Sequence, residues 1–140
     1  MKGCIVTKLE PGLTREATYA VTRDMSPPHV DGILSTSRMI GLIEDTCLAA
    51  VGPLLDEVRT TVGTHVDVTH VAPARMGEHV RITVRLVKVT QQRLLRFDVS
   101  VAARAGVIGT GTHQRLVVDR SSFIDPVPDP VPRLNGTAEG

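Results

Sequence analysis

The chain has 140 residues, the length of a single domain, and a formal net charge of +1, too small to favour electrostatic binding of nucleic acid. It contains no Trp, one Tyr and two Phe, so its core must consist mainly of aliphatic side chains. No basic start followed by an apolar run marks a signal peptide, and no stretch approaches the roughly 18 apolar residues of a membrane helix. Cys4 and Cys47 lie too far apart for a CxxC redox pair, and nothing indicates a disulfide framework. We therefore expect a soluble, cytoplasmic protein.

The first half of the chain predicts one strand and one long helix. Residues 16–22 alternate in polarity and predict a strand, and residues 25–35 are rich in Pro, Asp and Gly and predict a loop. From Thr36 to about Leu55, apolar residues recur at steps of three and four, which is typical of an amphipathic helix. Its start can be capped by Ser35, Thr36 or Ser37, and Gly52-Pro53 disturbs its end.

The second half predicts four antiparallel strands followed by a proline-rich tail. In the first of these strands, side chains of one face are expected to be Val62, Thr64, Val66, Val68 and His70. The other strands cover residues 80–86, 95–101 and 107–118, with turns at Gln91-Gln92 and Ala105-Gly106. Residues 1–123 are thus expected to form one domain, and residues 124–140 an extended, flexible tail. A helix packed on an antiparallel sheet is a two-layer α+β domain, which tends to pair with a second copy through its sheet edge.

Four residues could carry chemistry, and each also has a structural interpretation. Glu44 lies at the flank of the helix stripe and is either solvated or a partly desolvated acid/base. His70 is either a core residue or a general acid/base on a rigid strand. Thr36 either caps the helix or offers its hydroxyl and nearby N–H groups to an oxyanion. Gly63 marks either a bulge or a close approach to a ligand.

Other candidates give weaker signals. A metal site built from His65, His70 and His79 is geometrically poor, because His65 is expected on the opposite face of the strand from His70, so we expect no metal and no cofactor. Cys47 lies in the apolar stripe of the helix and is interpreted as a core residue. A basic group on two strands either faces solvent or binds phosphate: Arg81, Arg85, Lys88, Arg93 and Arg96.

Three stretches together resemble the fluoroacetyl-CoA thioesterase family of the hot-dog superfamily. They are TSRMIGLIEDTC (36–47), VGTHVDVTHVA (62–72) and IGTGTHQRLVV (108–118), and the resemblance covers residues 16–123. It implies a hot-dog fold, in which one long helix packs on a five- to six-stranded antiparallel sheet. It also implies a homodimer with its sites at the subunit interface.

The resemblance also implies the site. The family's catalytic residues fall on Thr36, Glu44 and His70, and its substrate-contacting residues on Gly63 and Arg115. This implies hydrolysis of a small or medium acyl thioester of coenzyme A or of an acyl carrier protein. The hypothesis requires the helix acid and the strand imidazole to lie together beside the threonine hydroxyl.

One departure from the family concerns the acyl group. The member that acts on fluoroacetyl-CoA has phenylalanines before its threonine, whereas residues 29–35 here read HVDGILS and contain no aromatic residue. We therefore expect a different, larger acyl group. Two alternatives stay open: a hot-dog protein that binds an acyl thioester or another small molecule without turnover, and a hydratase or dehydratase that leaves the thioester whole.

Overall fold

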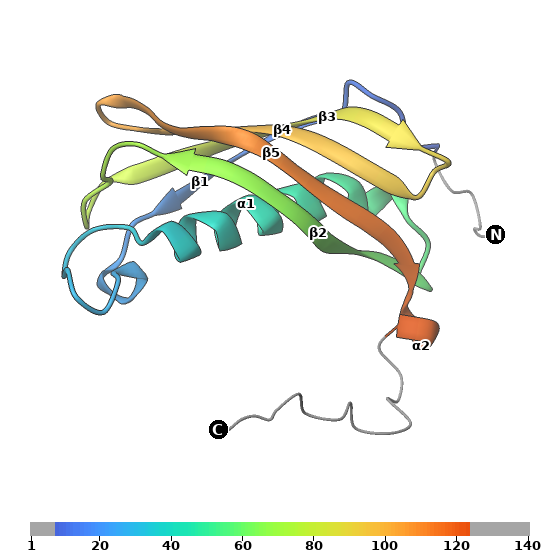
Figure 1. Ribbon diagram of the computed structural model, residues 1–140, viewed down its shortest axis with the longest axis horizontal. Coiled ribbons are helices and arrows are strands. Elements are labelled where there is room, and N and C mark those ends of the chain that lie inside the picture. Colours follow the sequence, from blue (N-terminus) through green and yellow to red (C-terminus); the bar gives the residue numbers. More distant parts are fainter. Residues whose placement is uncertain (1–7, 124–140) are drawn as a thin grey trace, which may run out of the picture.

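The computed structural model describes residues 8–123, which form one sheet wrapped around one long helix (Figure 1). The proline-rich tail expected over residues 124–140 lies outside the described residues. The strands are β1 (Thr14–Ala20), β2 (Arg59–His70), β3 (His79–Thr90), β4 (Leu94–Ala103) and β5 (Gly106–Asp119). The helices are α1 (Thr36–Val51) and the short α2 (Arg120–Phe123), with 3₁₀ turns η1 (Arg23–Met25) and η2 (Gly52–Leu54).

All five strands are antiparallel and lie in the order β1-β3-β4-β5-β2, so β1 and β2 form the two edges of the sheet. This agrees with the expected helix-on-sheet architecture. β1 begins and ends two residues earlier than the 16–22 expected, because its ladder with β3 ends at the pair Ala20–His79. Within residues 8–123, neither helix combines the length and the apolar character needed to cross a membrane.

Helix α1 is fixed at both ends by its sequence. Ser35 is the N-cap and its Oγ accepts the N–H of Arg38 at 3.1 Å. The α-helix ends at Val51, before the expected Leu55, because Pro53 has no N–H to continue the ladder and the chain tightens into η2. One face of α1 is buried: Met39, Leu42, Ile43, Thr46, Cys47, Ala50 and Val51.

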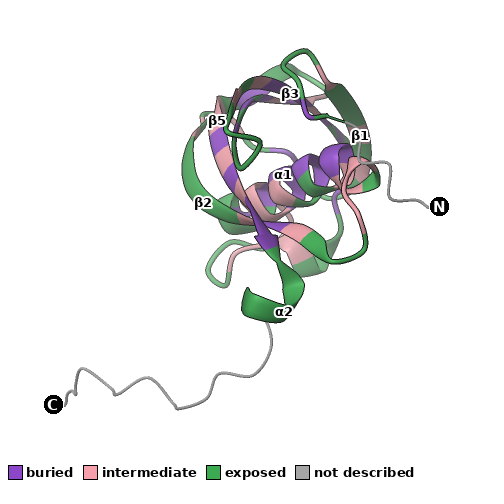
Figure 2. Ribbon diagram, turned by 90° about the vertical axis from the view of Figure 1, so that its right-hand side faces the viewer, coloured by how far each residue is buried: buried purple, intermediate pink, exposed green. Residues whose placement is uncertain are grey.

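The concave face of the sheet holds the core, and the helix lies within this curve (Figure 2). The alternation of β3 and β4 is confirmed: their inward residues are buried, namely Val80, Ile82, Val84 and Leu86, and Leu95, Phe97, Val99 and Val101. The expected hairpin turn at Gln91-Gln92 is also confirmed. Both residues have positive φ, 54° and 57°, which is typical of a tight turn between twisted strands.

The expected face of β2 is wrong in its first half, because the strand contains a bulge. The register with β5 shifts between Gly63 and His65, so Thr64 is the extra residue. Thr61 and Gly63 therefore face the same side as Val66, Val68 and His70, in place of Val62 and Thr64. The bulge interpretation of Gly63 is confirmed, and a simple two-residue period could not have shown which face it joins.

Strands β2 and β5 approach each other closely at two inward-facing glycines of β5. A Cβ at Gly109 would lie 2.7 Å from the backbone oxygen of Thr69 and 3.2 Å from Cε of Met39. A Cβ at Gly111 would overlap the backbone oxygen of Asp67. Any side chain at either position would push β2 away from its neighbour, so these glycines hold β2 against the sheet.

Candidate active site

Two of the expected site residues meet at one end of the helix. Thr36 is the first residue of α1, and His70 is the last residue of β2. Thr36 Oγ1 lies 2.8 Å from Nδ1 of His70, a hydrogen bond that links the helix start to the strand end. The Ser35 cap takes the N–H of Arg38, so it leaves the N–H groups of Thr36 and Ser37 for another partner. We call Thr36 and His70 the hydroxyl–imidazole pair.

The second ring nitrogen of His70 has no partner. Nε2 is buried and makes no hydrogen bond to any residue between 8 and 123. A buried polar atom without a partner is costly in a purely structural role. If Nδ1 carries the proton, it donates the hydrogen bond to Thr36 Oγ1, and Nε2 is unprotonated and can act as a base. If Thr36 donates to Nδ1, Nε2 carries a proton. In both cases Nε2 is the atom that the pair offers to a ligand.

The other three expected residues form a second group in the middle of the helix. Glu44 is half-buried on α1, Gly63 lies on β2, and Arg115 is opposite Gly63 on β5. A Cβ at Gly63 would lie 3.1 Å from Glu44 Oε2 and 3.5 Å from Arg115 Nη1. Even a methyl group at Gly63 would be crowded, so the glycine lets the carboxylate and the guanidinium approach the same point beside β2. We call these three residues the carboxylate–guanidinium group.

Arg115 is a buried cation held by hydrogen bonds to neutral groups. Its Nε donates to Thr61 Oγ1 at 2.7 Å, and its Nη2 donates to the backbone oxygen of Thr61 at 3.0 Å. Burial lowers the pKa of Arg115, while Cys47 and Glu44 act in the opposite direction. No ion pair within 4.0 Å joins Arg115 to a carboxylate in the part of the chain described. Its charge is thus available to an anionic ligand beside Gly63.

The structure does not bring the two groups together within one chain. Thr36 and Glu44 are eight residues apart on α1, which is about 12 Å along the helix axis. On the sheet, Gly63 pairs with Arg115, whereas His70 pairs with Gly109, which lies six residues earlier on β5. These two positions are roughly 20 Å apart along the strand. One chain therefore holds the expected site residues in two separate groups, one near each end of this stretch of β2, and each group is called a half-site below.

Sequence reasoning missed His113 and Thr61, which surround Arg115. His113 is 0% exposed, and its Nε2 lies 3.1 Å from Arg115 Nη1. Its place two residues before Arg115 in the stretch GTHQR could have revealed it, since residues two apart share a face of a strand. Thr61 gave no such signal, because the bulge at Thr64 reverses the face on which it was expected.

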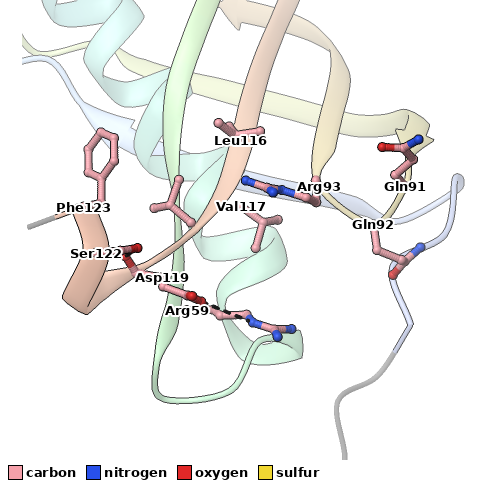
Figure 3. A pocket seen from close by; sticks show the side chains of 10 residues that line it. Arg59, Gln91, Gln92, Arg93, Leu116, Val117, Asp119, Ser122 and Phe123 are labelled. Carbon is pink, nitrogen blue, oxygen red and sulfur yellow. Dashed lines mark hydrogen bonds and ion pairs between the residues drawn. The ribbon is translucent and has the colours of Figure 1, made fainter.

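A cavity of about 630 Å³ lies away from both half-sites, at the end of β5 (Figure 3). Arg59, Arg93 and Phe123 contribute to its lining, and Arg59 pairs with Asp119 at 3.6 Å. It includes none of the five expected site residues.

The basic strand residues are all exposed, as expected of a solvated face. The group comprises Arg81, Arg85, Lys88, Arg93 and Arg96, and Arg81 pairs with Glu16 at 3.5 Å. Among residues 8–123, no cluster of three or more His, Cys, Asp or Glu side chains could hold a metal ion.

Comparisons with known proteins converge on one family. The model of the family described as fluoroacetyl-CoA-specific thioesterase matches residues 14–121. The fluoroacetyl-CoA thioesterase of Streptantibioticus cattleyicolor is 37% identical over 93 residues, which are 65% of this chain and 65% of that protein. The match thus spans slightly less than two thirds of that relative.

Solved structures give the same result for the fold. The fluoroacetyl-CoA thioesterase FlK superposes with a TM-score of 0.78 at 28% identity, over 83% of this chain and 93% of that one. A hot-dog-like protein from Thermanaerovibrio acidaminovorans superposes with a TM-score of 0.76 at 20% identity, over 81% and 87% of the two chains. The expected hot-dog fold is confirmed.

Cys47 should not react with thiol reagents in the folded protein. It is fully buried on α1, and burial raises the pKa of its thiol to about 12. In a Cys4→Ser variant, which leaves Cys47 as the only thiol, we expect reaction with a chromogenic disulfide to be at least about 100-fold slower than in urea. Rapid labelling without urea would show that the helix opens or that Cys47 is exposed.

Proposed function

Because the chain belongs to the fluoroacetyl-CoA-specific thioesterase family, we propose that it hydrolyses an acyl thioester of coenzyme A or of an acyl carrier protein. The observation that carries this proposal is the convergence of Glu44 Oε2 and Arg115 Nη1 on Gly63, where they lie 3.1 Å and 3.5 Å from the position of a Cβ. A carboxylate can activate the attacking oxygen or attack directly, and a buried cation can orient the carbonyl or stabilise its developing charge. Such a pair suits attack on a carbonyl carbon.

We further propose that a second copy of the chain completes each site. β2 is an edge strand, and its middle residue Val66 is 38% exposed although it is apolar. An antiparallel pairing of β2 with the β2 of a second copy, centred on Asp67 and with Thr64 bulged in both copies, places Gly63 opposite His70 of the other copy. The midpoint between Thr36 and Glu44 on α1 is Ile40. If the same two-fold axis passes beside Ile40, Glu44 of one copy lies next to Thr36 of the other. One register therefore joins the carboxylate–guanidinium group of each copy to the hydroxyl–imidazole pair of the other.

The flank of α1 that would face the second copy supports this register. Ile40 and Gly41 are half-buried, and Leu48 is exposed, so the flank around Glu44 is apolar and incompletely covered. A Cβ at Gly41 would meet nothing within 4 Å, which leaves room for a neighbouring helix to approach. A homodimer would cover both this flank and the edge of β2.

In the proposed reaction, Glu44 takes a proton from a water whose oxygen attacks the thioester carbonyl carbon, or its carboxylate attacks that carbon to give an anhydride that water then cleaves. The negative charge on the carbonyl oxygen is received by the N–H of Gly63 and by N–H groups at the start of α1, near Thr36. The carbon–sulfur bond breaks, and His70 Nε2 delivers the proton to the leaving thiolate. Arg115 orients the substrate. The products are a carboxylic acid and a free thiol.

The acyl group is proposed to be larger than fluoroacetyl. Among the residues before Thr36, Leu34 is buried and Ile33 is half-buried and bridges to Arg75, while Val30 is 40% exposed. None of them is aromatic, so the segment offers less side-chain volume above the acyl group than the phenylalanines of the relative. Aliphatic walls favour a longer aliphatic chain by about 0.8 kcal/mol for each methylene buried.

Removing either proton-transfer group should abolish most of the turnover. We expect Glu44→Gln and His70→Ala to lower kcat by on the order of 10²–10⁴-fold, measured as thiol release from a panel of acyl-CoA substrates. Glu10→Gln, the same change at an exposed carboxylate before β1, is the control and should keep wild-type turnover. Tight binding of acyl-CoA by the wild type without thiol release would instead indicate a binding protein. A changed acyl chain on an intact thioester, seen by mass spectrometry, would indicate a hydratase or dehydratase.

Mixing two inactive variants tests the shared site. When Glu44→Gln and His70→Ala chains exchange subunits, half of the dimers are mixed, and one of the two sites in each mixed dimer keeps both residues. About a quarter of the wild-type activity should therefore return. The matched control is Thr36→Ala mixed with His70→Ala, because both changes lie in the same half-site and no mixed dimer regains a complete site. Equal recovery in the two mixtures, or none in the first, would contradict the two-fold arrangement.

Substrate preference should respond to the segment before Thr36. We expect kcat/KM of the wild type to rise from acetyl-CoA by about 15-fold for a four-carbon acyl chain and up to about 200-fold for six carbons, since each buried methylene contributes about 0.8 kcal/mol. Val30→Phe should reverse this trend by filling the added space, and Val58→Phe, an exposed change near the other end of β2, should not. A wild-type preference for fluoroacetyl-CoA over all longer chains would refute the proposal.

A further inference from the structure

We propose that His113, held as a neutral imidazole with its proton on Nδ1, is the positioning residue that fixes Arg115 for substrate. The proposal rests on the function proposed above, because it assigns Arg115 a contact with the thioester. It adds a residue that neither the sequence motifs nor the expected catalytic set had assigned a role. His113 presents no polar atom to Gly63, because the atom of His113 nearest to the position of a Cβ on Gly63 is the carbon Cε1.

The tautomer of His113 follows from its two partners. Nδ1 lies 2.8 Å from the backbone oxygen of His65, and a carbonyl oxygen can only accept, so Nδ1 carries the proton. Nε2 lies 3.1 Å from Nη1 of Arg115, and a guanidinium can only donate, so Nε2 offers its lone pair. Both ring nitrogens of this fully buried side chain are thus satisfied by one protonation state, the neutral one.

This contact completes the attachment of the guanidinium. Of the five N–H groups of an arginine side chain, Thr61 takes one from Nε and one from Nη2, and His113 takes one from Nη1. The planar group is therefore held through all three of its nitrogens. Nη1 is also the nitrogen nearest to Gly63: it lies 3.5 Å from the position that a Cβ on Gly63 would take. Its second N–H is free to meet the substrate, and His113 determines where that N–H lies.

Protonation of His113 would break the arrangement. A proton on Nε2 would face the N–H of Arg115, placing two donors and two positive charges 3.1 Å apart. Burial lowers the pKa of His113, and the charge of Arg115 adds to this effect. The hydrogen bond to His65 and the carboxylate of Glu44 on α1 act in the opposite direction, and the imidazole of His65 has a small lowering effect. The neighbour on β4, Phe97, is uncharged.

The first test needs no substrate. In ¹⁵N spectra of the imidazole rings, His113 should show the Nδ1–H tautomer and should stay neutral at pH values where free histidine in the same buffer becomes protonated. In Arg115→Met, its titration should move toward higher pH, because the neighbouring positive charge is gone. An Nε2–H tautomer, or titration together with the free histidine, would overturn the proposal.

The second test is a double-mutant cycle in kinetics. His113→Leu should lower kcat/KM by about tenfold to a hundredfold, chiefly through KM, because a misplaced arginine loses substrate contact. His113→Gln, which keeps a polar group without titrating, should recover part of this loss and should be used if the leucine variant does not fold. In an Arg115→Met background, the His113 changes should have almost no further effect.

The outcomes separate the two proposals. Equal losses from His113→Leu with and without Arg115 would show a merely structural histidine, even if hydrolysis is confirmed. Absence of turnover in the wild type would overturn the proposed function and with it the role of His113 toward substrate. In that case the imidazole spectra would still decide whether His113 holds Arg115.

Discussion

The site depends on how β2 pairs with β5. The bulge at Thr64 shifts the register so that Gly63, and no larger residue, lies opposite Arg115. The buried guanidinium and the helix carboxylate can then share the space that a side chain would fill. Without the extra residue, Val62 and Thr64 would occupy this face, and their side chains would separate Glu44 from Arg115. Gly109 and Gly111 hold the two strands close enough for this pairing.

A buried arginine is costly unless every donor has a use. Here Thr61 accepts from Nε and Nη2 and His113 accepts from Nη1, so all three guanidinium nitrogens meet neutral acceptors and no carboxylate cancels the charge. Glu44 is close but forms no ion pair with it. An enzyme that must attract an oxyanion benefits from this arrangement, because a cation already paired with an acid would offer less to the substrate.

Much of the fold could be predicted because local patterns and tertiary packing agree. The stripe of α1, the alternation of β3 and β4, and the turn at Gln91-Gln92 all describe single elements, and all three are confirmed. Four of the five candidate residues could be singled out from their positions in helix and strand patterns, and their roles stay predictions. Their grouping could not be found this way, since it depends on the bulge at Thr64 and on distances along α1 that no motif records.

The residues that support the site were harder to find than those in it. Thr61 reaches Arg115, 54 residues away in the sequence, only because the bulge changes the face of the strand. His113 is near Arg115 in the sequence, but its tautomer depends on the backbone oxygen of His65, 48 residues away.

The stretch of β2 from Gly63 to His70 sets the spacing of both half-sites at once. An insertion or deletion of one residue there would turn either Gly63 or His70 to the opposite face and displace it by about 3.3 Å relative to the other. In a two-fold dimer, that single error would appear at both sites. The length of this strand segment should therefore be far less free to vary than the lengths of the loops, and natural diversity in this family should arise around it.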